Sequence, residues 1–274
     1  GISSQVKRHE GQLQPPASAS RPSDEPQTPN GPKARTRRPR PLPQGLVMIY
    51  EDRDILVVDK PPGLLTISTE TEKERTAYFL MMDYVRKGCA KSRNRVFVVH
   101  RLDRETSGLL VMAKSHEAKA KLQDQWDRAD KKYLAIVHGR LEKRTDTIST
   151  YLAENSARVV YSTSNTKMGK LSHTAYRVLK QAKEFALLEV ALLTGRKNQI
   201  RVHLAGIGHP VAGDKKYGKG IAFHKKLSLH AYSITLKHPV TGRMMTFAAK
   251  VPPHFYQIVG SIEGMDENYP KRPD

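Results

Sequence analysis

The 274-residue chain is poor in cysteine, in acidic residues and in long apolar runs. The single cysteine, Cys89, excludes an internal disulfide and a zinc site built on cysteine pairs. It favours a reducing compartment, so we expect a cytoplasmic protein. No apolar stretch approaches the roughly 20 residues that cross a bilayer, which excludes a transmembrane protein. Asp and Glu number 27 against 47 Lys and Arg, so the formal net charge is +20.

This excess of positive charge points to a polyanionic partner, most often nucleic acid, but it does not distinguish a binding protein from an enzyme. A hydrophobic content of 38% excludes a wholly disordered chain. Residues 1–45 contain nine of the 17 prolines and a basic run at 33–40, so they predict a disordered tail that either grips phosphates or keeps the chain soluble. We expect one catalytic domain over 46–260, a flexible tail over 261–274, and a monomer.

Apolar runs and alternating patterns between turn residues predict strands in this domain. They cover residues 46–50, 55–58, 95–99, 108–113, 133–137, 173–179 and 185–193, and a hairpin pairs 229–236 with 244–250. Helices are expected over 72–87, after a cap at Ser115, and over 198–205. Mostly sequential strands with a few inserted helices indicate an α+β fold, with a mixed, largely antiparallel sheet and flanking helices.

The segment 100–108, HRLDRETSG, carries the densest chemistry of the chain. It lies between two predicted strands, so its polar groups are expected on a loop that rigid elements hold. Arg101 and Arg104 flank Asp103, which is therefore expected to stay ionised and to suit a nucleophile or a base. The alternative is an ordinary polar turn with a surface ion pair.

The sequence gives little support for a metal site or for a phosphate-binding loop. The histidines His203, His209, His224 and His230 in the C-terminal part of the chain lack metal-ligand spacing. The glycine-lysine-glycine at 218–220 lacks the flanking residues of a phosphate loop. We therefore expect no metal and no cofactor.

Four segments, taken in order, resemble the RluA family of pseudouridine synthases. HRLDRETSGLLVMAKS at 100–115 resembles the family signature, DKPPGL at 59–64 its opening turn, and KKYLA at 131–135 its tyrosine strand. TGRKNQIRVHL at 194–204 resembles a further element, and it is followed by Gly208–His209–Pro210 and Gly213–Asp214. The resemblance covers nearly all of 46–250. It implies the pseudouridine synthase catalytic fold with a central RNA-binding cleft.

The resemblance also implies roles for individual residues. Asp103 is the catalytic aspartate, Arg201 the basic residue paired with it, and Tyr133 the tyrosine that stacks on the target base. Arg101 is expected to enter the RNA stack in place of the flipped uridine. Further RNA-binding candidates are His100, Arg196 and Lys60; for His100 a structural role fits as well, and Lys60 also fits a role in shaping the floor of the site.

The function implied is isomerisation of uridine in structured RNA, with large-subunit ribosomal RNA favoured over transfer RNA. A non-catalytic RNA-binding ribosome-assembly factor is the alternative from another class, and intact Asp103, Tyr133 and Arg201 argue against it. A base-releasing glycosidase needs a second carboxylate, for which Glu105 is a poor candidate. Two features depart from the family pattern. Lys197–Asn198 stands where many members carry Thr-His or Ser-His, and the amino-terminal S4-type RNA-binding domain of many members is not recognisable in this sequence.

Overall fold

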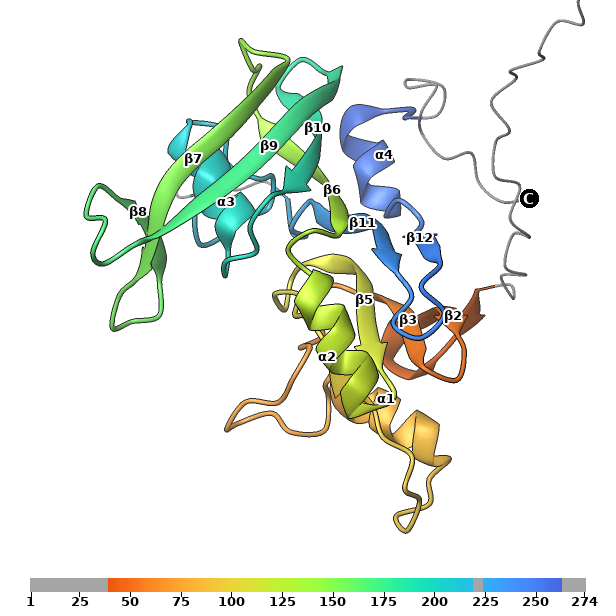
Figure 1. Ribbon diagram of the computed structural model, residues 1–274. Helices are drawn as coiled ribbons and strands as arrows, with labels where there is room; N and C mark the ends of the chain where they lie inside the picture. Colours follow the sequence, from red (N-terminus) through yellow and green to blue (C-terminus); the bar gives the residue numbers. More distant parts are fainter. Residues whose placement is uncertain (1–38, 219–223, 263–274) are drawn as a thin grey trace, which may run out of the picture. The chain divides into compact units, whose positions relative to one another are not determined.

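Within the part of the chain that the structure describes, the strands form one twelve-stranded sheet with helices packed on it (Figure 1). The computed structural model describes residues 39–218 and 224–262, all within the unit 36–274. Along the sheet the strands run β1-β2-β3-β5-β11-β6-β10-β9-β7-β8, while β12 pairs with β11 and β4 with β5. Of the pairings, β5 with β11 is parallel and the others are antiparallel. The predicted α+β class with a mixed, largely antiparallel sheet is confirmed.

The element bounds follow the sequence pattern closely in the central sheet. The strands are β1 Arg40–Pro41, β2 Val47–Glu51, β3 Ile55–Lys60, β4 Phe97–Val98, β5 Ser107–Ala113, β6 Asp130–His138, β7 Thr145–Glu154, β8 Val160–Thr163, β9 Lys170–Gln181, β10 Phe185–Leu192, β11 Leu229–Lys237 and β12 Met244–Ala248. The helices are α1 Ala77–Arg86, α2 His116–Gln125, α3 Gln199–Gly206 and α4 Pro253–Val259, with a 3-10 turn at Pro43–Gly45. None of these helices is long and apolar enough to cross a membrane.

Helix ends are set by local caps. The Ser115 hydroxyl accepts a hydrogen bond from the backbone N–H of Ala118, as the sequence predicts for the start of α2. Helix α1 begins at Ala77 instead of residue 72, because Thr76 is extended and its hydroxyl caps the backbone N–H of Phe79. The prediction of a helix over 72–76 is therefore wrong.

Most strands predicted from apolar runs are present, one is shorter than predicted, and strands with few apolar residues were missed. The long strands and the C-terminal hairpin are confirmed, whereas the predicted strand at 95–99 shortens to β4, Phe97–Val98. Strands β7 and β8 and helix α4 were not predicted. In β7 the polar face is exposed, so its composition is that of a loop.

The central strands are buried on both faces. On one face Leu188 and Val190 of β10 pack with Ile200 of α3. On the other face, Leu187 packs with Phe255 of α4. Burial on both sides explains the nearly continuous apolar run of β10.

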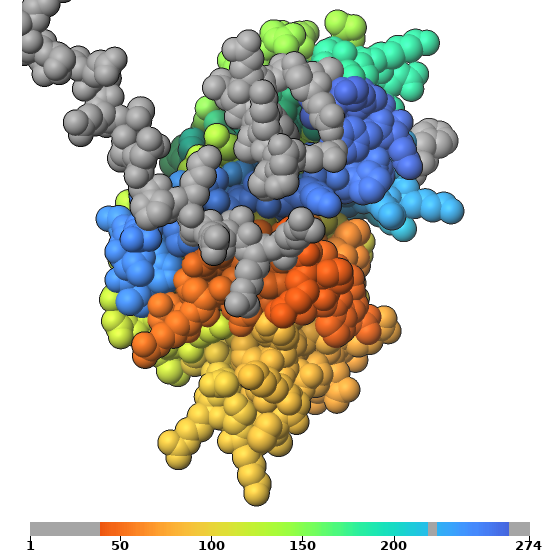
Figure 2. All heavy atoms as spheres, turned by 90° about the vertical axis from the view of Figure 1, so that its right-hand side faces the viewer, coloured from red at the N-terminus to blue at the C-terminus, as the bar shows by residue number. Residues whose placement is uncertain are grey.

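Strand β2, near the start of the described chain, lies beside β12, near its end. Figure 2 shows the N-terminal strands, in orange, beside the C-terminal strands and helix, in blue. Ordered structure begins before residue 46, because Arg40 and Pro41 pair with Met48 and Val47. Ile262, within the predicted C-terminal tail, is buried. Residues 1–38 and 263–274 of the predicted tails lie outside the described residues, so the one-domain division stays a prediction.

Candidate active site

A cavity of about 740 Å³ opens where the loop 100–106, strand β6 and the start of α3 meet. Its lining includes six of the seven residues that the sequence singled out: His100, Arg101, Asp103, Tyr133, Arg196 and Arg201. They are drawn together from positions about 100 residues apart. The cavity is large enough to hold a small ligand or one extruded base.

The loop that carries Asp103 is fixed by backbone hydrogen bonds on several sides. The Thr66 hydroxyl donates to the carbonyl of Leu102 and accepts from its N–H, at 2.8 and 3.1 Å. The N–H of Gly63 donates to the carbonyl of Arg104, and the N–H of Thr106 donates to the carbonyl of Asp103 itself. These bonds hold the carboxylate in one place before any substrate arrives.

Gly108 lets strand β5 approach β11 at the base of this loop. A Cβ at Gly108 would lie 2.2 Å from the carbonyl oxygen of Ala231, and its φ of +114° lies in the region that favours glycine. The glycine thus permits the close parallel pairing of Gly108 with Ala231.

Arg201 links Asp103 to a second, buried carboxylate. Its Nε and Nη2 donate to the two oxygens of Asp214 at 2.7 and 2.8 Å, while Nη1 lies 3.5 Å from Oδ2 of Asp103. The Asp214 side chain is fully buried, whereas that of Asp103 is 31% exposed. Asp214 therefore fixes the position of the Arg201 guanidinium. The Asp103 carboxylate lies beside the same positive charge, and its exposed part faces the cavity.

Arg201 and Asp214 each stabilise the charged form of the other. Burial raises the pKa of the Asp214 carboxyl, but hydrogen bonding and charge from Arg201 and the N–H groups of Tyr217 and Lys216 outweigh it, so the pKa lies below its usual value. Burial lowers the pKa of Arg201, but Asp214 and Asp103 outweigh that effect and raise it. Sequence reasoning paired Arg201 with Asp103 alone; the Gly213–Asp214 pair of the motif was the signal for the second partner.

Tyr133 lies on β6 between β10 and β11, with its side chain packed against two core clusters. Burial and then the charge of Asp103 raise the pKa of its phenol. Because the phenol stays protonated at neutral pH, its ring offers the cavity a flat, uncharged wall. That wall suits a pyrimidine ring.

His100 lines the cavity, and its ring is held by contacts within the fold. Its Nε2 accepts a hydrogen bond from the backbone N–H of Val111 at 3.0 Å, and its ring stacks on Trp126 at 4.2 Å. Burial, with a smaller contribution from Lys131, lowers the pKa of His100 to about 3, so the ring is neutral. The assignment of His100 to RNA binding is not supported by these contacts, which favour its alternative, structural role.

Lys60 does not line the cavity, so its contacts do not support the predicted RNA binding. Its side chain is fully buried, and Nζ donates to the carbonyl oxygens of Pro61, Leu64 and Arg104 at 2.7–2.9 Å. Burial lowers the pKa of Lys60 to about 7, against the opposing charges of Glu105 and Asp103. Lys60 thus links the 59–64 turn to the loop 100–106. This agrees with the expectation that Lys60 shapes the floor of the site.

Three arginines near the cavity have different roles. Arg101 and Arg196 are exposed at its mouth, where a phosphate or a base can reach them. Arg104 does not flank Asp103 as expected, because its guanidinium pairs with Glu72 at 2.8 Å. Among the described residues, the cation that pairs with the Asp103 carboxylate within 4 Å is Arg201.

One cluster outside the cavity has metal-ligand composition: Asp52, Asp54 and His238. Asp52 already accepts four hydrogen bonds, from the backbone N–H groups of Asp54 and Ile55, from the Tyr50 hydroxyl and from His238. These bonds tie the β2–β3 turn to the β11–β12 turn. The cluster is accounted for as a structural network.

The fold and the cavity define an enzyme site in which a rigidly held, arginine-paired aspartate faces a basic cleft. A family model for RNA pseudouridylate synthase matches residues 54–206. An uncharacterized RNA pseudouridine synthase from Mycoplasma genitalium is 36% identical, over 79% of this chain and 70% of that protein. Ribosomal large subunit pseudouridine synthase C from Rickettsia bellii is 34% identical, over 77% of this chain and 70% of that protein.

Solved structures agree with this assignment. Human RNA Pseudouridylate Synthase Domain Containing 1 superposes with a TM-score of 0.60 at 25% identity, covering 74% of this chain and 82% of that one. Human RNA Pseudouridylate Synthase Domain Containing 4 has the same fold, with a TM-score of 0.64 at 22% identity over 76% and 89% of the two chains. The chain belongs to the RNA pseudouridylate synthase family and is an RNA pseudouridine synthase. The resemblance identified in the sequence is confirmed.

Proposed function

We propose that this enzyme isomerises uridine in large-subunit ribosomal RNA, with Asp103 as its catalytic carboxylate. The observation that carries the catalytic assignment is the juxtaposition of Asp103 and Arg201 at 3.5 Å on the wall of the cavity. The choice of RNA is supported by relatives named for the ribosomal large subunit, from Rickettsia bellii and Haemophilus influenzae, at 34% and 31% identity.

The reaction breaks the bond between uracil nitrogen 1 and the ribose, rotates the base, and joins carbon 5 to the same ribose carbon. The proton on carbon 5 leaves and nitrogen 1 gains a proton from water, so the product is an isomer of the substrate. Asp103 serves either by attacking the ribose carbon or by taking a sugar proton; both routes need a charged carboxylate beside the sugar. Its second oxygen, Oδ1, has no hydrogen-bond partner among the described residues and is available for this step.

The other groups of the cavity bind and orient. We assign Tyr133 to the face of the flipped base, because its protonated ring is flat and lies close to Asp103. Arg101 and Arg196 are assigned to the RNA strand, since both guanidinium groups are exposed at the mouth. A guanidinium stacks on bases and binds phosphate, so Arg101 suits the space that the uridine leaves.

The test measures release of tritium from transcripts of large-subunit ribosomal RNA that contain 5-³H-uridine. The wild-type protein should release tritium, and Asp103→Asn should release none while it binds RNA and unfolds as wild type does. Asp124→Asn is the matched control, because Asp124 is exposed and pairs only with Arg128 one helical turn away.

Transfer RNA transcripts form the second arm of the experiment. Release from these and not from ribosomal RNA would refute the proposed substrate and leave Asp103 as the catalytic residue. An active Asp103→Asn protein would refute the catalytic assignment. Tight binding without release from either RNA would favour the assembly-factor alternative. Cytoplasmic location and the monomeric state stay predictions.

A further inference from the structure

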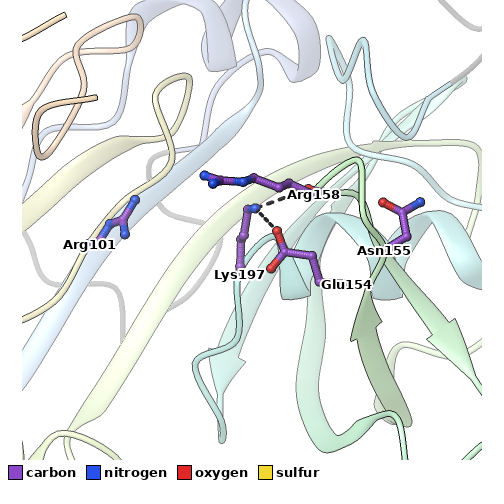
Figure 3. A pocket seen from close by; sticks show the side chains of 5 residues that line it. All are labelled: Arg101, Glu154, Asn155, Arg158 and Lys197. Carbon is purple, nitrogen blue, oxygen red and sulfur yellow. Dashed lines mark hydrogen bonds and ion pairs between the residues drawn. The ribbon is translucent and has the colours of Figure 1, made fainter. Parts of the chain in front are cut away.

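A second cavity, of about 510 Å³, adjoins the first. Five residues line it: Arg101, Glu154, Asn155, Arg158 and Lys197 (Figure 3). Arg101 and Lys197 also line the larger cavity, so the two spaces share a boundary. A group bound in the second cavity is therefore a near neighbour of a nucleotide held at Asp103.

The charges of the second cavity are positive and incompletely neutralised. The ammonium group of Lys197 pairs with the Glu154 carboxylate, and its Nζ also donates to the carbonyl oxygen of Arg158 at 3.2 Å. Within the described residues, the guanidinium groups of Arg101 and Arg158 form neither an ion pair nor a hydrogen bond. Figure 3 shows the Arg158 side chain extending toward Arg101. Three cations thus meet one carboxylate.

Arg158 occupies a backbone position that arginine rarely takes. It lies in the turn between β7 and β8 with a φ of +57°, in the left-handed region that favours glycine. The turn is closed by Asn155, whose side chain accepts from the N–H of Val159 at 2.9 Å, and these bonds do not involve the guanidinium. The hydrogen bonds that close the turn do not require an arginine side chain at this position. We therefore infer that the guanidinium serves to bind a ligand.

Lys197 connects this turn to helix α3. It immediately precedes Asn198, the residue before α3, and its bonds to Glu154 and to the Arg158 carbonyl fix the β7–β8 hairpin against the start of that helix. The second cavity is therefore built partly from the residues that lead into α3.

We propose that Arg158, with Lys197 and Arg101, binds a phosphate of the RNA strand beside the target uridine. This inference rests on the proposed function, because it takes the ligand at Asp103 to be a nucleotide of RNA. Guanidinium groups bind phosphate oxygens in bidentate geometry, and the positive lining favours an anion. Arg158 is a substrate-binding residue in this proposal, and Glu154 is a positioning residue that holds Lys197.

The experiment uses Arg158→Gly, because glycine relieves the left-handed backbone and should preserve or raise the stability of the turn. Binding of the unmodified large-subunit RNA transcript is measured from 50 to 200 mM salt. Removing one phosphate contact lowers the salt slope by about 0.7–0.9, so the affinity deficit should shrink about 3-fold over this range. In tritium release, KM should rise about 10-fold with kcat unchanged.

Two further variants separate a phosphate contact from other effects. Arg158→Lys keeps the charge and should keep the wild-type salt slope. Arg93→Gly removes an exposed arginine that lines neither cavity, and should keep the wild-type slope and KM. An Arg158→Gly protein with wild-type slope and KM would overturn the inference, as would equal losses in Arg93→Gly. If the wild-type protein releases no tritium from any RNA, the proposed function fails instead.

Discussion

Replacing Asp214 with asparagine tests how the active-site arginine is held. The fully buried Asp214 carboxylate takes two hydrogen bonds from Arg201, at 2.7 and 2.8 Å, and two more from backbone N–H groups. In Asp214→Asn the single oxygen keeps some of these bonds, but the amide N–H₂ then faces a guanidinium donor. Arg201, whose side chain is 11% exposed, is left with Asp103 as its one carboxylate.

The magnitude follows from burial. Removing one partner of a buried ion pair typically costs about 3–5 kcal/mol, because the remaining charge stays desolvated. Asp103 compensates in part, but its Oδ2 is 3.5 Å from the guanidinium and its side chain is 31% exposed. We therefore expect a loss near the lower end, about 3 kcal/mol, which in a chain of this size lowers Tm by about 6–12 °C.

The loss should depend on pH in a defined direction. The pKa of Asp214 is lowered in the folded protein, so its stabilising contribution is complete above the ordinary carboxyl value near 3.8 and disappears as the pH falls through the lowered value. The difference between wild type and Asp214→Asn should therefore be constant from pH 7 to about 5. It should shrink toward pH 2.5.

The assay is urea unfolding at each pH, followed by the fluorescence of Trp126, the single tryptophan of the chain. The matched control is Asp124→Asn, which removes an exposed pair and should leave the unfolding midpoint unchanged within error. A loss below about 1 kcal/mol at pH 7 would refute the claim that Asp214 fixes Arg201. So would a difference that persists undiminished at pH 2.5.

Three further predictions concern the frame of the site. In thermal unfolding, Gly108→Ala should destabilise the protein by more than about 3 kcal/mol, because the added Cβ would clash with the β11 backbone. The control Gly206→Ala, with open space around the added Cβ, should be neutral or stabilising. Thr66→Val removes both bonds to the catalytic loop and should cost about 2 kcal/mol and lower kcat in tritium release with little change in RNA affinity. Lys60→Met removes the side-chain donor to three carbonyl oxygens, of which, within the described residues, only that of Arg104 keeps another donor, the N–H of Gly63. It should cost about 3 kcal/mol in urea unfolding. An unchanged midpoint in either variant would contradict the assigned contacts.

Elements whose determinants are local could be predicted from the sequence. The start of α2 depends on the Ser115 hydroxyl and on buried Ala118 and Leu122, all within eight residues. Strand β10 has apolar residues on both faces, so its run stands out from the polar segments around it. In such segments, propensity and burial favour the same conformation.

Elements that depend on distant contacts were missed or misplaced. Strand β7 contains Thr145, Asp146, Thr147 and Ser149, a composition typical of turns, yet it pairs with β9 along eight residues. Its strand conformation is supplied by the neighbouring strand and by burial of Ile148 on one face. Helix α1 begins late because Thr76 caps it there, while the preceding polar residues offered no competing stop signal in the sequence.

The sequence by itself determined the family and the identity of the aspartate expected to act, because short runs around Asp103 and Arg201 carry the family pattern. Tertiary structure alone decided how these residues are held. Arg201 is 98 residues from Asp103 and 13 from Asp214, yet it lies between them in space. It likewise decided that Lys60 is buried under the catalytic loop. Burial and charge act through distance in space, which a linear pattern does not record.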